Sequence, residues 1–554
     1  MMSDLNVLVL GLGDSGLAMA AWCHRLGATV RVWDSRETPP QLANLLHLRK
    51  AEFFSGALTA ESLVGVQRVF KSPGLSPLDT RLAAVYASGL PIQGELDLFA
   101  QALADLKATR GYKPAVLAIT GTNGKTTTTC MTGLLVERAG KRVVMAGNIG
   151  PSMLTTLADA LDKEPIAAVA EVPAQEEQAP AAATTLEAVD ALLDDAPLPI
   201  EPPPVKGPVF QVLPEVWVLE LSSFQLDDVI GFEPTAAAVL NLTQDHLDWH
   251  GDMAAYGRAK ARIFGAFATS DAVMVINRDD PLVEAMVPAA VVVKQGRGRA
   301  AKAVGRKVVR FGLDAPTLPG DFGLVQEGGM AWLVRARELD ETIKKRKGDE
   351  AEEISLQRLM PADALRVRGR HNAANALAAL ALATAADCAL APMLHGLREY
   401  RGEPHRVEHV ATINGIDFYD DSKGTNVGAT VAAITGLGAD RAPGQLVLIL
   451  GGDGKGQDFS PLRPGIARHA RAVALIGRDG PQIEAALAGV DVPLRFHATL
   501  EAATAWCLAQ AHSGDSVLLS PACASLDMFR NYAHRAEVFV SAVQALSNEA
   551  GVIA

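Results

Sequence analysis

The sequence predicts an α/β protein of three consecutive domains: a Rossmann-like N-terminal domain, a central P-loop ATPase-like domain with a parallel sheet, and a Rossmann-like C-terminal domain. Short apolar runs that end in glycine or polar turns alternate with amphipathic stretches along nearly the whole chain, which is typical of helices packed on parallel sheets. A chain of 554 residues is too long to fold around a single hydrophobic core, and its length suggests about three domains. Glycine-containing loops follow apolar runs at residues 11–16 and 121–124, as phosphate-binding α/β units require.

The three domains are expected at residues 1–94, 95–401 and 402–554. Strands of the first are expected at 7–10, 30–33 and 69–70. Strands of the second are expected at 115–120, 142–145, 217–219, 237–240 and 273–276. The third opens with a hairpin at 409–419 that turns at Asn414-Gly415, followed by strands at 446–450, 473–476 and 517–519.

Two stretches do not fit this pattern. Residues 164–207 are rich in Ala, Pro, Glu and Asp and lack aromatic residues, so we expect a mostly disordered insertion with a short helix at 184–195. The charge run DETIKKRKGDEAEE at 340–353 is expected to be a solvated surface loop.

Composition excludes several classes of protein. A net charge of −12 argues against nucleic acid or an anionic membrane as a partner. The five cysteines are scattered and never form C-x-x-C, which argues against a disulfide framework or a zinc site; Cys523 is better interpreted as a buried thiol than as a nucleophile. No basic leader or long uninterrupted apolar run is present, so we expect a soluble, cytoplasmic protein without a membrane span. We also expect a monomer.

Residues 11–16 read GLGDSG, which fits two patterns. Gly11, Gly13 and Gly16 form the G-x-G-x-x-G of dinucleotide-binding turns, between an apolar run and a helix-like stretch, and Asp34 ends the next expected strand. The same letters resemble the nucleophile loop of trypsin-like proteases, but only ten residues precede Gly11, which leaves no room for the upstream His and Asp. A phosphate-bearing ligand is therefore favoured over a purely structural turn, and an NAD-dependent dehydrogenase is one interpretation.

The stretch AVLAITGTNGKTTTT at 115–129 predicts an ATP site. A strand ends in a glycine-containing loop whose amides can cradle phosphates, Lys125 can reach the β- and γ-phosphates, and Thr126 can hold Mg²⁺. The match to the P-loop pattern is incomplete, because Ile119 stands where the first glycine is usual.

Acidic residues and histidines in two further strings suggest a metal site. Glu220 lies within the apolar run of WVLELSSFQLD, where an ionised carboxylate needs a cation, unless it faces solvent from an edge strand. NLTQDHLDWH supplies Asp245 and His246; Asp248 and His250 can be exposed residues at a helix start. The H-E-x-x-H pattern of zinc enzymes is absent, so Mg²⁺ with oxygen ligands and one imidazole is favoured. Lys260, judged alone, is an ordinary surface lysine of a helix.

Polar loops follow three strands of the last domain: YDDSKGTN at 419–426, GGDGKGQDF at 451–459 and LSPACASLDMF at 519–529. Ligands bind outside the carboxyl ends of strands in open parallel sheets, so these loops are expected to form one site. Lys423 and Lys455 suit a carboxylate or a phosphate.

Taken together, the strings TGTNGKTT, ELSSFQL, NLTQDHLDWH, RGRHNAANALAA, PHRVE, DDSKGTNVGAT, GGDGKGQDF and LSPACASLDMF resemble, in order, those of the Mur ligase family of peptidoglycan synthesis. The resemblance covers the chain except the 164–207 insertion and the charged loop. It implies an enzyme that uses ATP and Mg²⁺ to activate the L-alanyl carboxylate of UDP-N-acetylmuramoyl-L-alanine as an acyl phosphate, which the amine of D-glutamate then attacks.

The resemblance also implies roles for individual residues. ATP would be bound by Gly121, Thr122, Asn123, Gly124, Lys125, Thr126, Thr127, Asn372, Asn375, His405, Arg406 and Asp421. Mg²⁺ would be held by Thr126, Glu220, His246 and Lys260, the last as a CO₂-derived carbamate, and the catalytic residues would be Lys125, Glu220, His246 and Lys260. The UDP-sugar would contact Asp14, Ser15, Asp34, Ser35, Arg36, Ser72, Pro73, Gly74, Asn148 and Gln225. D-Glutamate would contact Asp245, His246, Lys423, Thr425, Lys455, Ser525, Leu526 and Tyr532.

Small departures and alternatives remain at this point. Tyr532 stands where a phenylalanine is found in a similar ligase, and the spacing from His246 to Lys260 is one residue shorter. Another Mur ligase or a folylpolyglutamate synthase-like enzyme is the alternative within the superfamily; the DNPR string of diaminopimelate-adding members is absent. Outside it, the alternatives are the dehydrogenase and a silent nucleotide-binding scaffold.

Overall fold

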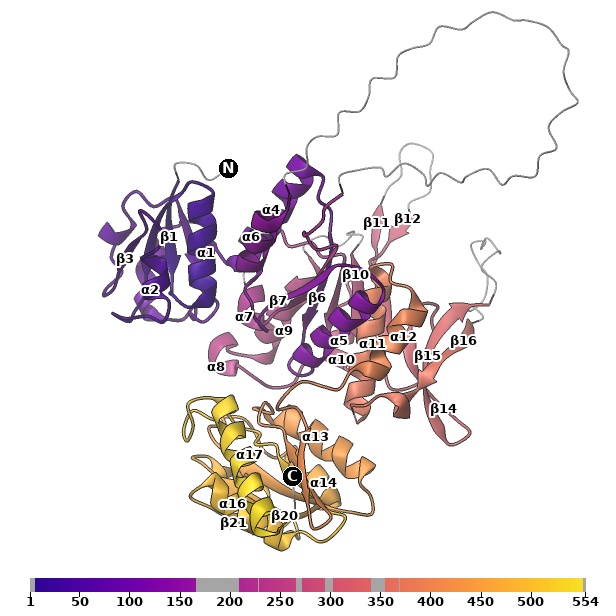
Figure 1. Cartoon of the computed structure of the whole chain (residues 1–554). Coiled ribbons are helices and arrows are strands. Elements are labelled where there is room, and N and C mark those ends of the chain that lie inside the picture. Colours follow the sequence, from indigo (N-terminus) through magenta and orange to yellow (C-terminus); the bar gives the residue numbers. More distant parts are fainter. Residues whose placement is uncertain are drawn as a thin grey trace, which may run out of the picture.

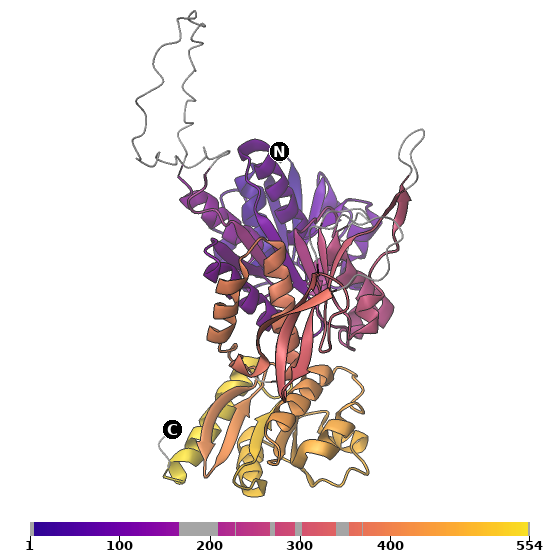
Figure 2. The same cartoon turned by 90° about the vertical axis from the view of Figure 1, so that its right-hand side faces the viewer.

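The computed structural model describes residues 5–165, 209–227, 229–265, 272–293, 302–339, 354–367 and 369–551. Three sheets follow one another along the chain, and Figures 1 and 2 show the third lying at one end of the second. The expected helix at 184–195, the charged loop at 340–353 and all but two residues of the expected insertion lie outside the described residues. In the part of the chain that is described, no helix combines the length and apolar character that crossing a membrane would require.

The N-terminal unit is a five-stranded parallel sheet in the order β3-β2-β1-β4-β5. Its strands are β1 (Asn6–Leu10), β2 (Thr29–Trp33), β3 (Glu52–Phe54), β4 (Arg68–Lys71) and β5 (Ile92–Gln93), and its helices are α1 (Asp14–Arg25), α2 (Leu42–Leu45) and α3 (Ala83–Ala87). The GLGDSG turn joins β1 to α1 as expected. A Cβ atom on Gly16 would lie 1.9 Å from the carbonyl oxygen of Gly11, so only glycine permits this close approach of helix and turn.

The central sheet has nine strands in the order β16-β15-β14-β13-β10-β9-β6-β8-β7. These are β6 (Ala115–Thr120), β7 (Val143–Gly147), β8 (Val216–Glu220), β9 (Ala236–Val239), β10 (Val273–Asn277), β13 (Lys307–Phe311), β14 (Phe322–Glu327), β15 (Met330–Glu338) and β16 (Ile354–Pro361), with a separate hairpin of β11 (Val291–Val293) and β12 (Lys302–Val304). The six strands from β7 to β13 are parallel. Five of them were expected from the sequence, and β13 was not. The antiparallel pairs β14–β15 and β15–β16 extend the sheet beyond the sequence-based expectation.

Helices cover both faces of the central sheet. They are α4 (Glu95–Arg110), α5 (Lys125–Arg138), α6 (Met153–Lys163), α7 (Ser223–Leu226), α8 (Leu247–His250), α9 (Met253–Ala261), α10 (Pro281–Glu284), α11 (Arg370–Ala385) and α12 (Leu390–Glu399). The alanine-rich α11 packs with α5 and α12 in one core, and α4, α6 and α9 pack in another that is continuous with the N-terminal unit. Single 3₁₀ turns lie at Glu61–Leu63, Thr80–Leu82, Arg262–Phe264 and Ala362–Ala364.

The C-terminal sheet has the order β17-β18-β22-β19-β20-β21, parallel except for the expected hairpin of β17 and β18. Its strands are β17 (Glu408–Ile413), β18 (Ile416–Asp420), β19 (Leu446–Gly451), β20 (Ala470–Ile476), β21 (Leu494–Phe496) and β22 (Ser516–Leu519). Helices α13 (Val427–Asp440), α14 (Leu462–His469) and α15 (Gly480–Ala486) cover one face, and α16 (Leu500–Gln510) and α17 (Tyr532–Glu549) the other. The loops that follow β18, β19 and β22 therefore emerge at one edge.

Candidate active site

The loop between β6 and α5 has the geometry of a phosphate-binding loop. Gly121 and Gly124 adopt positive φ angles of 155° and 81°, which turn the chain sharply into the helix. Asn241, just after β9, holds the loop: its carbonyl oxygen accepts from the Thr122 amide at 3.0 Å and its side-chain oxygen from the Asn123 amide at 2.8 Å. The loop is thus fixed by the neighbouring strand, a role the sequence did not reveal for Asn241.

Two lysine amines lie against this loop. The Nζ atom of Lys125 donates to the carbonyl oxygens of Gly121 and Thr122 at 2.9 and 2.8 Å, so its ammonium group lies within the loop. Lys260 is not the surface residue that its helix position alone suggests: it is 1% exposed, and its Nζ donates to Gly121 O at 2.9 Å and Thr120 Oγ1 at 3.2 Å. Burial lowers the pKa of both lysines, that of Lys260 well below its usual value, and the nearby Lys125 lowers it further. Burial therefore disfavours the ammonium form of Lys260.

Glu220 provides a buried, partly unsatisfied carboxylate beside the loop. It ends β8, which lies inside the sheet rather than at its edge, and it is 2% exposed. Oε1 accepts from Asn148 Nδ2 at 2.8 Å, whereas the buried Oε2 has no hydrogen-bond partner among the described residues. The Thr126 hydroxyl accepts from Arg406 at 2.9 Å. A carboxylate oxygen without a partner next to a hydroxyl-bearing P-loop fits a divalent cation with oxygen ligands.

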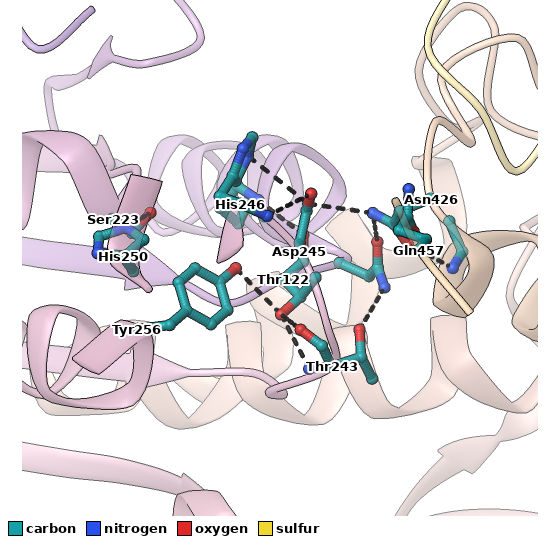
Figure 3. Close-up of polar contacts among 12 residues, drawn as sticks. Thr122, Ser223, Thr243, Asp245, His246, His250, Tyr256, Asn426 and Gln457 are labelled. Atoms are coloured by element: carbon teal, nitrogen blue, oxygen red, sulfur yellow. Dashed lines mark hydrogen bonds and ion pairs between the residues drawn. The ribbon is translucent and has the colours of Figure 1, made fainter. Parts of the chain in front are cut away.

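His246 begins α8 in the left-handed region, with φ 53°. Its ring packs edge-on against Phe224 at 4.7 Å, and its Nε2 lies 3.6 Å from Asp245 Oδ2 (Figure 3). Burial lowers the pKa of His246, although Asp245 opposes the shift. Behind it, the hydroxyl of Tyr256 lies 3.2 Å from Thr122 Oγ1 and so ties α9 to the P-loop. Asp248 is exposed, in line with an ordinary helix-start residue.

A cavity of about 300 Å³ lies between the P-loop, the start of α11 and the C-terminal unit. Of the residues expected around the nucleotide, it is lined by Asn123, Gly124, Thr127, Asn372, Asn375, Arg406 and Asp421. His405 does not line it; its Nδ1 lies 2.7 Å from Asp420 Oδ2 instead. Burial raises the pKa of Asp421 to about 7, although the Ser520 hydroxyl donates to it at 2.6 Å. Asn277, Phe311 and His371 also line the cavity. Asn277 and Phe311 lie outside the quoted motifs, and His371 lies within RGRHNAANALAA but was given no role.

The residues expected around a UDP-sugar lie mainly in the N-terminal unit. Asp34 accepts from the Leu12 amide in the glycine turn at 2.8 Å and pairs with Arg36 at 2.9 Å. Burial opposes its ionisation, but the hydrogen bonds from Arg36 and Leu12 outweigh burial and lower the pKa of Asp34 to about 2. The Ser72 hydroxyl donates to Gly11 O at 3.0 Å.

The remaining residues of this expected set differ in their surroundings. Asp14, Ser35 and Gly74 are exposed, and Ser15 is half-buried near them in the turn. Pro73 and Gln225 line one small cavity between β4 and α7. The Gln225 side chain accepts from the Ser222 amide at 3.0 Å and caps its own helix, and Asn148 contacts Glu220. These last two residues therefore have structural partners in the protein without ligands.

The three C-terminal loops form one continuous surface. The backbone of Asp453 pairs with that of Ala524 at 2.9 and 2.8 Å, and the Ala522 amide donates to Gly424 O at 3.0 Å. Beneath them Arg535, fully buried, donates to the carbonyl oxygens of Ser422 and Cys523. The expected residues Lys423, Thr425, Lys455, Ser525, Leu526 and Tyr532 all belong to these loops or to the helix start beside them. Arg535 was missed, because a buried helix position gives no loop signal; Cys523 is buried as expected, and burial raises its pKa to about 12.

The loops face the central unit. Lys423 Nζ lies 5.5 Å from the centre of the Tyr532 ring, and Glu220 and Arg406 are close enough to act on its pKa, which burial lowers. Lys455 likewise acts on His246. The P-loop and metal-binding candidates of the central unit thus adjoin the lysines of the C-terminal unit. The structure therefore brings the P-loop and metal-site strings next to the C-terminal loops.

Comparisons with known proteins agree with this arrangement. The Mur ligase MurD-like N-terminal domain matches residues 5–94, the Mur ligase middle domain matches 119–186 and 210–383, and the Mur ligase glutamate ligase domain matches 405–523. The UDP-N-acetylmuramoylalanine–D-glutamate ligase of Albidiferax ferrireducens is 57% identical over 99% of this chain and 98% of its own length, and that of Burkholderia pseudomallei is 53% identical over 98% of each. The structure of MurF ligase from Thermotoga maritima in complex with ADP shares the fold, with a TM-score of 0.51, 15% identity and coverage of 98% of this chain and 96% of that one. The chain belongs to the Mur ligase family.

Proposed function

We propose that this chain is an ATP-dependent ligase that joins D-glutamate to UDP-N-acetylmuramoyl-L-alanine and releases ADP and phosphate, in the cytoplasmic synthesis of peptidoglycan precursors. Two relatives that match over nearly their full length, at 57% and 53% identity, are named UDP-N-acetylmuramoylalanine–D-glutamate ligase. The observation that carries the proposal is the contact of the P-loop with the C-terminal unit, through Arg406 to Thr126 at 2.9 Å and Asn426 to Asn123 at 3.0 Å. We place the domain boundaries after residues 94 and 401.

The first step activates the substrate carboxylate. One carboxylate oxygen of the L-alanyl group attacks the γ-phosphorus of ATP, the bond to the β-phosphate oxygen breaks, and an acyl phosphate and ADP result. Lys125 exchanges its two loop carbonyls for phosphate oxygens and stabilises the charge on the transferring group. Mg²⁺, with Thr126, Glu220 and His246 as ligands, would neutralise further phosphate charge.

Lys260 would contribute a second anionic group. Because burial favours its neutral amine, the amine can add to CO₂ and release one proton, which gives a carbamate. The carbamate places a negative charge next to the P-loop, where a cation on the phosphates would stabilise it. Its amine already lies 2.9 Å from Gly121 O, so no large movement is needed.

The second step forms the amide. The deprotonated amine of D-glutamate attacks the acyl carbon, its nitrogen loses one proton to solvent, and the tetrahedral intermediate expels phosphate. Lys423 and Lys455 would bind the carboxylates of the amino acid, and Tyr532 would pack beside Lys423. Closure of the C-terminal unit on the P-loop keeps water from the acyl phosphate.

The GLGDSG turn would bind the pyrophosphate of the UDP-sugar at the start of α1, whose first amides are free of helix partners. Asp34 holds this turn through the Leu12 amide and holds Arg36 at its edge, near the expected uridine. The turn therefore serves a nucleotide sugar rather than NAD in this proposal.

Phosphate release from Mg²⁺-ATP tests the proposal. With UDP-N-acetylmuramoyl-L-alanine present, we expect release with D-glutamate and not with L-glutamate, diaminopimelate, L-lysine or D-alanyl-D-alanine. Release with another amine instead would assign the chain to a different amino acid. NADH binding without any phosphate release would favour the dehydrogenase interpretation and contradict the proposal.

A further inference from the structure

Asn426 connects the C-terminal unit to the P-loop, although it is not among the site residues expected from the motifs. It precedes α13 and is 6% exposed. Its Nδ2 donates to Asn123 Oδ1 at 3.0 Å. The same atom lies 3.5 Å from Asp245 Oδ2, and Figure 3 shows Asn426 beside Asp245. Its Oδ1 accepts from the Ala429 amide at 2.9 Å and so caps the helix. One side chain therefore both starts α13 and contacts the nucleotide-binding loop.

Gln457 continues this connection towards the loop of Lys455. Its Oε1 accepts from the amide of Val427, the residue after Asn426, at 3.0 Å. Its Nε2 donates to Gly454 O, also at 3.0 Å, and Gly454 directly precedes Lys455. The backbone from Gly454 to Lys455 is thus held from the start of α13.

The close approach at Gly428 supports the same connection independently. A Cβ atom there would lie 2.8 Å from Thr243 Oγ1 and 3.0 Å from Asn123 Nδ2. The first turn of α13 therefore touches the central unit so closely that a side chain at this position would push the two units apart.

We infer that Asn426 and Gln457 are positioning residues that couple the ATP site to the D-glutamate site, an inference that rests on the proposed function. The contact of Asn426 with the P-loop orients α13. Gln457 transmits that orientation to the loop of Lys455. The affinity for D-glutamate then depends on the contact between Asn123 and Asn426. Neither residue is expected to touch the reacting atoms.

Steady-state kinetics of the full chain test this inference. Asn426→Ser keeps a capping oxygen but is too short to reach Asn123, and Gln457→Ala removes the second link. Each single variant should raise the KM for D-glutamate about 5- to 10-fold, the size expected for one hydrogen bond, with kcat nearly unchanged. Gln457→Ala should leave the KM for ATP unchanged, because the side-chain hydrogen bonds that Gln457 makes to described residues go to Val427 and Gly454 of its own unit. The double variant should raise the KM for D-glutamate no further than either single variant, because both break one chain of contacts.

Controls separate coupling from folding. Thr499→Ala removes the N-cap of α16, remote from these loops, and should leave both KM values unchanged, whereas Gly428→Ala should reproduce Asn426→Ser. Thermal unfolding verifies that each variant is folded. A double variant with multiplied effects, about 25- to 100-fold, or single variants with unchanged KM for D-glutamate would overturn the inference. Wild-type protein without D-glutamate-dependent phosphate release would instead contradict the proposed function.

Discussion

Replacing Lys125 with methionine tests the chemistry of the P-loop most sharply. The substitution keeps an unbranched side chain but removes the ammonium group that lies 2.9 and 2.8 Å from the carbonyl oxygens of Gly121 and Thr122. This group already lies within the loop before nucleotide binds, and it only has to exchange these two carbonyl oxygens for phosphate oxygens. Removing one such preorganised charge costs about 2.7–4 kcal/mol of transition-state stabilisation, so we expect turnover to fall at least about a hundredfold.

The same substitution should not destabilise the fold. Burial lowers the pKa of Lys125, which means that the charged form is disfavoured in the folded protein. The free energy of unfolding of Lys125→Met should therefore equal or exceed that of wild type in urea titrations. Lys163→Met, on the exposed end of α6, is the matched control and should retain full phosphate release. Turnover of folded Lys125→Met within about tenfold of wild type would refute the assignment of the P-loop.

Substitutions at three further residues give distinct results. In CO₂-depleted buffer, wild-type phosphate release should rise when bicarbonate is added, whereas Lys260→Met should be inactive and unresponsive; a bicarbonate-independent wild type would contradict the carbamate. The depressed pKa of Asp34 contributes stability above pH 4 that is lost as the pH falls towards 2, so the excess stability of wild type over Asp34→Asn, measured in urea, should shrink by about 1 kcal/mol between pH 7 and pH 3. A constant difference would show that the pKa of Asp34 is not depressed. Tyr532→Phe keeps the ring beside Lys423 and should change the KM for D-glutamate less than about threefold, whereas Tyr532→Ala should raise it more. Equal effects of the two substitutions would show that the ring does not contribute to D-glutamate binding.

The parallel strands that the sequence predicted are continuous apolar runs, whereas the parallel strands β3, β5, β13 and β21 were not predicted. β1, β6, β8, β19 and β22 are buried on both faces, and the hairpin turn at Asn414-Gly415 has its own signal. The strands β14–β16 were missed because arginine, glutamine or glutamate lies within or at the end of each apolar run, and exposure varies irregularly along each strand.

The candidate site was predicted in its parts but not in its assembly. Loop motifs indicated Lys125, Glu220 and Lys423, because polar residues after buried strands stand out. The burial of Lys260 depends on α9 packing beside β6, which helix spacing alone does not show. Asn426 and Arg535 act through contacts between segments more than a hundred residues apart, and only the folded chain brings those together.

An isotope-transfer measurement tests the proposed reaction most directly. UDP-N-acetylmuramoyl-L-alanine with ¹⁸O in its alanyl carboxylate is incubated with Mg²⁺-ATP, D-glutamate and the protein, and the released phosphate is examined by mass spectrometry. Because a carboxylate oxygen becomes the bridge of the acyl phosphate and leaves with phosphorus when the amine attacks, each phosphate should contain one ¹⁸O atom, and the nucleotide-sugar product should gain one glutamate. Unlabelled phosphate would mean that ATP is hydrolysed without carboxylate activation and would contradict the account.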